Sequence, residues 1–224
     1  MLIPSIDLMS GKIVQLVQGE KKALDFDDFD YWTERFAKYP LVQLIDLDAA
    51  IGTGDNRELI ARFLSRLPCQ VGGGIRSLTA AREALALGAH RVIIGSALFK
   101  DGQIQRDFAA ELARELGPDR LTFGVDTKQG RVAIHGWRTL TEFTAPEAMR
   151  ALDDFCGAFL YTNVDTEGLL QGFPQQVVPD LLAATTRKLI VAGGITRREE
   201  IDQLDQVGVD AIAGMAIYTG RLEA

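Results

Sequence analysis

The sequence of 224 residues predicts a (β/α)8 barrel, an α/β fold in which eight parallel strands alternate with helices. Eight short apolar or β-branched runs alternate with longer stretches of helical spacing, as βαβ units and a parallel sheet require. The chain also contains an internal repeat of about half its length. No segment rich in Pro, Gly and Ser divides it, so one domain over residues 1–224 is expected. A doubly wound open sheet is the alternative.

The expected strands each span four to eight residues, a length typical of buried parallel strands. In order they are LIPSIDL (2–8), VQLIDLD (42–48), CQVGG (69–73), RVIIGS (91–96), LTFGVDT (121–127), AFLYTNVD (158–165), KLIVAGG (188–194) and AIAGMAI (211–217).

Helices are expected where apolar residues recur every three or four positions. Over residues 56–67 this spacing places Leu59, Ile60 and Phe63 on one face. The segment 77–88 behaves likewise and ends on Gly88, a residue suited to the end of a helix. Residues 103–116 and 198–208 follow the same pattern. The acidic run DFDDFDYW at 25–32 is expected to be a solvated loop and the start of a helix.

Four motifs recur in the same order at nearly one spacing. SIDLMSGKIVQL begins at residue 5 and GVDTKQGRVAIH at residue 124. The glycine loops VGGGIRS and AGGITRR, the pairs GSALF and GMAIY, and two Asp-containing segments repeat 117 to 120 positions apart. The chain is therefore predicted to be two homologous half-barrels, about 1–118 and 119–224. The second half leaves little chain for a full eighth helix.

Composition excludes several classes of protein. The formal net charge is −7, and no basic face that would suit a nucleic-acid partner is evident. The N-terminus resembles no signal peptide and no apolar run suits a membrane, so a cytoplasmic location is expected. Cys69 and Cys156 lie in apolar runs without a CxxC motif and are expected to be buried thiols. The only histidines, His90 and His135, are too few for a His-based metal site.

The duplicated glycine loops are candidate phosphate sites. Each Gly-Gly-Ile segment stands between a strand and a helix, where free backbone N–H groups and a close approach favour an anion. Gly95 and Gly214 follow the next strand of each half. Two adjacent strand ends form one cradle, so two halves give two cradles at one mouth. A doubled loop therefore suits a substrate with a phosphate at each end. The alternative is that these glycines only form tight turns.

Asp7 and Asp126 are candidate catalytic carboxyl groups. Each ends the first strand of its half, so the two stand on opposite sides of the barrel and point into the mouth where barrel active sites lie. Such a pair serves as acid and base if burial raises one pKa from about 4. The alternative is that each Asp caps the turn that ends on the glycine four residues later.

Three further side chains near these motifs are ambiguous. Trp137 could stack on a heteroaromatic ring or pack within the protein. Arg76 could clamp a phosphate or be solvated at a helix start. His135, with no second histidine nearby, is expected to be structural or solvent-facing.

These segments resemble a known family. PSIDLMSGKIVQLVQGE, LIDLDAA, QVGGGIRS, RVIIGSA, GVDTKQGRVAIHGW, YTNVDTEGLLQG and VAGGIT are similar to the phosphoribosylformimino-aminoimidazole carboxamide ribotide isomerases of histidine biosynthesis, over nearly the whole chain. The Gly-Trp pair after the fifth strand favours this family over the related cyclases. The resemblance implies an Amadori rearrangement of an aminoaldose to an aminoketose, without a metal or organic cofactor.

The resemblance also implies roles for individual residues. Asp7 would be the base that removes the C2′ proton, Asp126 the acid that opens the ribose ring, and Thr162 would hold the intermediate. Trp137 would stack on the aminoimidazole or close over it. The residues expected to bind substrate and its phosphates are Gly73, Gly74, Arg76, Gly95, Ser96, Trp137, Gly193, Gly194, Gly214 and Met215. The expected partner is the bisphosphorylated ribotide alone, and a monomer is the expected state.

The sequence departs from the family pattern at several positions. The sixth loop reads Glu167-Gly168-Leu169 where the family has Asp-Gly-Thr, so a catalytic carboxylate lies one methylene further out. A misplacement of about 1 Å costs on the order of 100-fold in rate. Gln15 replaces a common arginine, and the first loop and the C-terminal tail are short. Three hypotheses remain: this isomerase, an isomerase that also or only uses phosphoribosylanthranilate, and a non-catalytic phosphosugar-binding relative.

Overall fold

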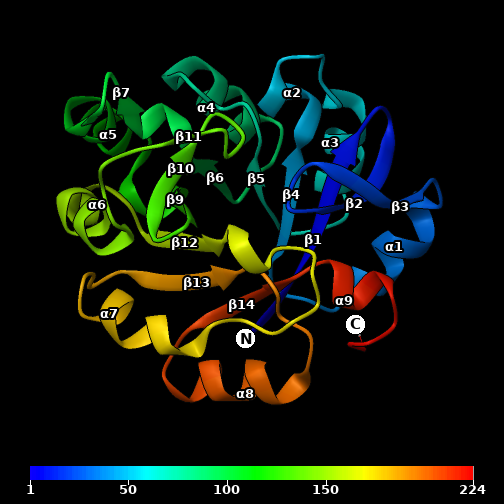
Figure 1. The fold of residues 1–224 in the computed structure, drawn as a ribbon. Helices are drawn as coiled ribbons and strands as arrows, with labels where there is room; N and C mark the ends of the chain where they lie inside the picture. The colour runs from blue at the N-terminus through cyan, green and yellow to red at the C-terminus, as the bar shows by residue number, and fades with distance from the viewer. Residues whose placement is uncertain (224) are drawn as a thin grey trace.

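Eight parallel strands close into a barrel in the computed structural model, which describes residues 1–223 (Figure 1). Each strand pairs with the next, and the last pairs with the first. Every strand expected from the sequence is present. In order they are β1 (Leu2–Met9), β4 (Val42–Asp46), β5 (Cys69–Gly72), β6 (Arg91–Ile94), β9 (Leu121–Lys128), β12 (Ala158–Asn163), β13 (Lys188–Ala192) and β14 (Asp210–Ala213).

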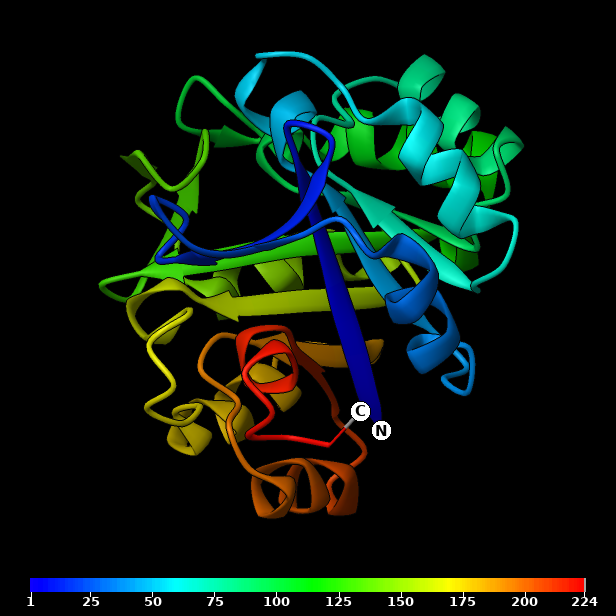
Figure 2. The same ribbon diagram turned by 90° about the vertical axis from the view of Figure 1, so that its right-hand side faces the viewer.

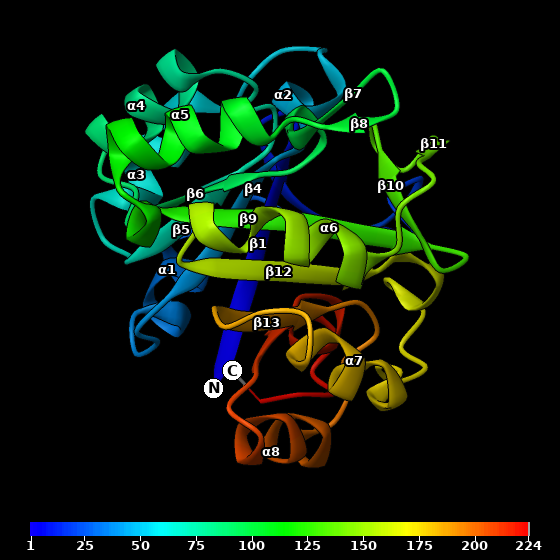
Figure 3. The ribbon, with the colours of Figure 1, turned by 90° about the vertical axis from the view of Figure 1, so that its left-hand side faces the viewer.

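The helices lie outside the barrel and cover its strands (Figures 1 and 3). The four helices expected from apolar spacing form as α3, α4, α5 and α8. Side-chain caps fix several starts, such as Ser77, which accepts from the Ala80 amide at the start of α4. The helices are α1 (Phe29–Phe36), α2 (Leu47–Ile51), α3 (Arg57–Leu64), α4 (Leu78–Ala86), α5 (Arg106–Leu116), α6 (Ala145–Leu152), α7 (Val178–Leu182), α8 (Arg198–Gln206) and α9 (Met215–Tyr218).

Three hairpins extend beyond the barrel strands. They are β2 (Lys12–Val17) with β3 (Lys21–Phe26), β7 (Phe99–Lys100) with β8 (Gln103–Ile104), and β10 (Arg131–Ile134) with β11 (Thr139–Leu140). Figure 2 shows the blue β2–β3 hairpin reaching over one end of the barrel towards the green segment of the second half. The first hairpin of each half follows the first strand of that half, as the repeat predicts.

Six of the eight expected strands end one to four residues earlier than the sequence suggested, and two of them run directly into a helix. VQLIDLD stops at Asp46, because the Asp46 carboxylate accepts from the Ala49 amide and starts α2. AIAGMAI stops at Ala213 and continues as α9. The shortage of chain for an eighth helix is confirmed, since α9 has only four residues. An aromatic cluster closes this side of the barrel instead, with the Tyr218 ring 4.2 Å from that of Trp32.

The buried apolar side chains form two cores, one between the strands and the helices and one inside the barrel. Between strands and helices lies the larger core, and Cys69 and Cys156 are buried thiols there, as expected. The interior holds a smaller cluster that includes Ile3, Leu160 and Ile190. Because strand side chains alternate, Asp7 points to the same side of its strand as Ile3, which is the interior. This alternation positions the functional site at one end of the barrel.

The repeat is visible in the hydrogen-bond register. Ser5 is paired with Gln43 across β1 and β4, while Gly124, the residue that corresponds to Ser5 in the repeat, is paired with Leu160 across β9 and β12.

The organisation as one domain over residues 1–224, with two internal halves that meet near residue 118, stays a prediction. Its last residue, Ala224, lies outside the described residues. Within residues 1–223, no helix is long and apolar enough to cross a membrane.

The first glycine of each Gly-Gly-Ile loop is required by packing. A Cβ at Gly73 would overlap the carbonyl oxygen of Asp46, and a Cβ at Gly193 would overlap that of Asn163. Both glycines have positive φ, +95° and +100°. The tight-turn interpretation therefore accounts for these two positions whatever they bind. At Gly95, by contrast, φ is negative and a Cβ would meet nothing within 4 Å.

We expect Gly193→Ala to lower the free energy of unfolding by about 3 kcal/mol or more, because the methyl group meets backbone that cannot yield. Gly208→Ala is the matched control, since its φ of +77° is strained but its Cβ would meet nothing within 4 Å. Its cost should be about 1 kcal/mol. Gly95→Ala should cost less than Gly193→Ala, because its methyl group would meet nothing within 4 Å. Urea unfolding measures all three, and equal losses at 193 and 208 would contradict the packing argument.

Candidate active site

Three carboxyl groups gather at the carboxyl end of the barrel strands. Asp7 lies near the end of β1 and Asp126 near the end of β9. Glu167 follows β12 in the sixth strand–helix loop. All three side chains are partly buried. The charges of Asp7 and Asp126 act on Glu167, so the three form one electrostatic group.

The Asp7 carboxyl group accepts a hydrogen bond from Ser5, two residues earlier on the same strand. Burial raises the pKa of Asp7 to about 6, and a hydrogen bond from the Ser5 hydroxyl, 3.0 Å from Oδ1, opposes the rise. The Tyr218 hydroxyl donates to the Ser5 carbonyl at 3.1 Å, and burial together with the charge of Asp7 raises the Tyr218 pKa. Asp7 does not cap the turn that ends on Gly11. The Gly11 amide bonds to Asn56 instead.

The Asp126 carboxyl group is held by a tryptophan from the β10–β11 hairpin. The Trp137 indole Nε1 donates to Asp126 Oδ2 at 2.8 Å. Burial raises the pKa of Asp126, while the Trp137 indole and the Thr162 hydroxyl lower it as hydrogen-bond donors to the ionised form. The structure therefore brings Asp7, Asp126, Thr162 and Trp137 to one mouth, where sequence reasoning placed them.

Glu167 is the most strongly shifted acid of this group. Burial raises its pKa to about 8, and the negative charges of Asp7 and Asp126 add to the rise. Its backbone is fixed by the first hairpin, because the Gln18 amide donates to the Glu167 carbonyl at 3.1 Å. At neutral pH, Glu167 therefore holds a proton while Asp7 is mostly ionised.

Hairpins from both halves meet above these carboxyl groups. A Cβ at Gly19, between β2 and β3, would lie 2.7 Å from the Trp137 ring, so the hairpin backbone packs directly on the indole. The His135 amide in turn donates to Ser96 Oγ at 2.9 Å. Trp137 and His135 both have positive φ, 65° and 55°. The indole therefore links the first hairpin, the second hairpin and Asp126.

The two glycine loops differ in what surrounds them. At Gly95 a Cβ would meet nothing within 4 Å, and Ser96 Oγ next to it accepts from the His135 amide. At Gly214 a Cβ would lie 2.6 Å from Gln15 Oε1, so this buried amide fills part of the second candidate cradle. Met215, next to it, is also buried. Gly74 and Gly194 have φ of +71° and +95° beside their first glycines. Their binding roles stay predictions.

Arg76 lies beside the first glycine loop, because its guanidinium and a Cβ at Gly74 would meet the same Ala49 carbonyl. It is exposed, and its guanidinium donates to the carbonyls of Ala49 and Ala50 at the end of α2. Its role as a phosphate clamp stays a prediction, but these carbonyls already hold two of its N–H groups.

Sequence reasoning missed the residue that organises the seventh loop. Glu200, buried in the first turn of α8, accepts from the Phe173 amide at 2.8 Å and from the amides of Thr196 and Arg197 at 3.0 Å each. Burial raises its pKa, but these bonds outweigh burial and the pKa is lowered. The signal in the sequence was a glutamate three positions into the helix, the position of a capping box.

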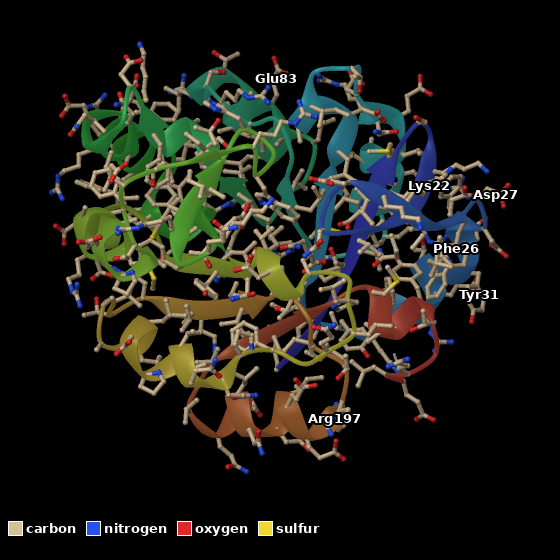
Figure 4. All side chains as sticks on the ribbon, viewed as in Figure 1. Lys22, Phe26, Asp27, Tyr31, Glu83 and Arg197 are labelled. Carbon is tan, nitrogen blue, oxygen red and sulfur yellow. The ribbon has the colours of Figure 1, made fainter. Side chains whose placement is uncertain are left out.

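Two arginines near the second glycine loop were also missed. A cavity of about 510 Å³ is lined by Leu170, Gln171, Thr196, Arg197 and Arg221. Figure 4 places Arg197 beside the beginning of α8. The cavity adjoins the Gly193–Gly194 loop in sequence and gives an anion two cationic neighbours there. In residues 1–223, no group of three or more His, Cys, Asp or Glu side chains is arranged to hold a metal ion.

Fold and site together define a (β/α)8-barrel protein of two related halves, with interacting acids gathered at the carboxyl end of its strands. The family described as Histidine biosynthesis protein matches residues 1–223, and the chain belongs to this family.

Curated relatives cover nearly the whole chain. A protein of Methanocaldococcus jannaschii is 37% identical over 231 residues, covering 99% of this chain and 95% of the relative. One from Thermus thermophilus is 39% identical, covering 99% and 95%. One from Archaeoglobus fulgidus is 34% identical, covering 99% and 94%. All three are named 1-(5-phosphoribosyl)-5-((5-phosphoribosylamino)methylideneamino) imidazole-4-carboxamide isomerase.

Proposed function

We propose that this chain is an isomerase of histidine biosynthesis that converts the bisphosphorylated aminoaldose ribotide to its aminoketose isomer. The observation that carries the proposal is similarity over the full chain to relatives named for this isomerase. The mouth of the barrel fits the reaction, since an Amadori rearrangement needs one group that gives a proton and one that takes a proton.

Asp126 is the proposed acid. Its proton goes to the ribose ring oxygen, the C1′–O bond breaks, and the nitrogen lone pair forms a C1′=N double bond. Asp7 is the proposed base and takes the C2′ proton, whose bonding electrons form the C1′=C2′ bond of an enolamine. Asp7 returns its proton to C1′, and loss of the enol proton gives the ketose. Glu167, protonated at neutral pH, gives its proton to Asp126 and takes the enol proton in its place, so all three carboxyl groups regain their starting states.

The two phosphates of the substrate are proposed to bind the glycine loops of the two halves. Gly95 and Ser96 offer an open backbone for one of them. The other binds beside Gly194 and Gly214, with Arg197 and Arg221 adding positive charge. When substrate binds, Trp137 is proposed either to close over the aminoimidazole ring or to release its hydrogen bond to Asp126 and stack on that ring. The proposal includes a cytoplasmic monomer without metal or organic cofactor, for which sedimentation and metal analysis are direct tests.

One observation favours a second candidate, an isomerase that also or only uses phosphoribosylanthranilate. That substrate carries a single phosphate and a carboxylate. The neutral Gln15 side chain stands against Gly214 and narrows the second cradle, which a substrate with one phosphate leaves empty.

The test is turnover of both substrates by the purified chain. Formation of the aminoketose from the two-phosphate ribotide is followed by absorbance with the next enzyme of the pathway coupled, and phosphoribosylanthranilate is assayed in parallel. We expect turnover of the two-phosphate substrate. Turnover of phosphoribosylanthranilate alone would establish the second candidate. Tight binding of either without turnover would overturn both and favour a phosphosugar-binding protein.

A further inference from the structure

A row of buried polar side chains crosses the interior of the barrel below Asp7. The Thr122 hydroxyl donates to Gln70 Oε1 at 3.4 Å, and Gln70 Nε2 donates to Gln43 Oε1 at 3.2 Å. Gln43 Nε2 donates to Ser5 Oγ at 3.3 Å, and Ser5 Oγ donates to Asp7 Oδ1 at 3.0 Å. The first four residues are buried on β9, β5, β4 and β1. We call them the polar row.

Every hydrogen bond of the polar row runs in the same direction, towards Asp7. Each buried amide and hydroxyl finds its partner within the row, which offsets the cost of burying these groups. Ser5 has a single hydroxyl proton, and Gln43 Nε2 occupies an acceptor site of its oxygen. The proton is therefore directed at Asp7. A row of aligned bonds in a low-dielectric interior also strengthens its last member.

The polar row breaks the internal symmetry of the barrel. In register, Ser5 is paired with Gln43, and Gln43 with Gln70. The corresponding positions of the second half, by the same pairing, are Gly124, Leu160 and Ile190. These three carry no polar side chain. A layer built only to fill the barrel would serve equally well with apolar residues at the positions of Ser5, Gln43 and Gln70, as it does at the three corresponding positions of the second half.

The break in symmetry matches a difference between the two aspartates. Asp7 receives a hydrogen bond from Ser5 on its own strand, whereas Asp126 receives hydrogen bonds from Trp137 in a loop and from Thr162 on β12. The two aspartates thus have different partners, and the polar row reaches only Asp7 among the hydrogen bonds of the described residues.

We propose that Ser5, Gln43 and Gln70 are positioning residues that hold the Asp7 carboxylate in one orientation as the base. This inference rests on the proposed function, in which Asp7 takes the C2′ proton. The charge of Asp7 acts on two other ionisable groups, Glu167 in the sixth loop and Tyr218 on α9, and Asp126 across the mouth also acts on Glu167. The variants below leave all of these in place.

The experiment compares Ser5→Ala and Gln43→Leu with the wild type by two readouts. The first is the pKa of the Asp7 carboxyl, measured by carbon-13 NMR on the free protein. The second is the dependence of kcat and KM on pH. We expect Ser5→Ala to raise the Asp7 pKa by about one pH unit, because a hydrogen bond to the ionised form is lost. The acid limb of the plot of kcat against pH should move to higher pH by the same amount.

At pH 6 that displacement lowers kcat roughly five-fold, with little change in KM. Gln43→Leu leaves the Ser5 hydroxyl in place, but residue 43 no longer directs its proton. We therefore expect the Asp7 pKa to rise by less than in Ser5→Ala. Ser5→Thr retains the hydroxyl and should restore the wild-type profile. Leu160→Ile is the matched control, since Leu160 is the symmetry-related position of Gln43 and its substitution should leave the Asp7 pKa unchanged.

The proposal is overturned if Ser5→Ala and Gln43→Leu lower thermal stability yet leave the Asp7 pKa and the acid limb where they were. The polar row would then be structural only. Failure of the proposed function gives a different result, because the NMR readout needs no turnover. A displaced Asp7 pKa in a protein that isomerises neither substrate would reject the proposed function alone. If Ser5→Ala does not fold, Gln43→Leu decides by the same two readouts.

Discussion

Replacing Asp7 by Asn should abolish the isomerisation while substrate still binds. The amide is nearly the same size as the carboxylate but cannot take the C2′ proton. Loss of a general base lowers kcat roughly 100- to 10,000-fold. Coupled absorbance assays give kcat, and calorimetric titration with the aminoketose product gives the dissociation constant, which should change less than about three-fold.

Asp126→Asn should lose turnover to a similar extent, since it can no longer protonate the ring oxygen. Asp202→Asn is the control for both, because Asp202 is exposed on α8 and pairs with Arg198 on the same helix. It should keep full activity. If Asp7→Asn and Asp126→Asn also kept full activity, the assignment of acid and base would be wrong.

A bell-shaped pH profile is the second large expectation. Asp7 must be ionised to act as base, so activity should fall as pH drops through about 6. Glu167 must hold its proton, so activity should fall again as pH rises through about 8. These limbs belong to the group of three interacting carboxyl groups, and the profile reports their macroscopic values.

Glu167→Gln removes the group that loses its proton in the basic limb. We expect kcat at neutral pH to fall about 100-fold and the basic limb to disappear, while the acid limb stays, because Glu167 is uncharged where Asp7 titrates. Glu167→Asp is the matched variant and should keep a basic limb, since a carboxyl group remains. A basic limb near pH 8 that persists in Glu167→Gln would show that another group supplies it.

Much of this protein follows from its sequence because barrel strands and amphipathic helices leave periodic signals. All eight strands and the four best-patterned helices form where apolar spacing places them. The duplicated motifs also predict the position of Asp7 and Asp126 at one mouth, since first strands of equivalent halves stand opposite each other in a barrel. Full-length family similarity agrees with the resemblance that those motifs carry.

Local chemistry was harder to anticipate where a side chain's partner lies far along the chain. Arg76 was expected near a phosphate, and whether it contacts one stays untested, but its guanidinium binds the carbonyls of Ala49 and Ala50. Glu200 was overlooked because its partners include Phe173, 27 positions away. Neither contact has a periodic signature, so neither could be derived from spacing.

The sequence by itself determined the barrel, its two related halves and the residues that end its strands, because strand period and helix period are local properties of the chain. Only the tertiary structure decided how those residues act on one another. Burial and the charges of Asp7 and Asp126 raise the Glu167 pKa, and Gly19 packs on Trp137 across the mouth. The polar row reaches Asp7 from β9, β5 and β4. These effects depend on distances between segments far apart in the chain, which only closure of the barrel brings together.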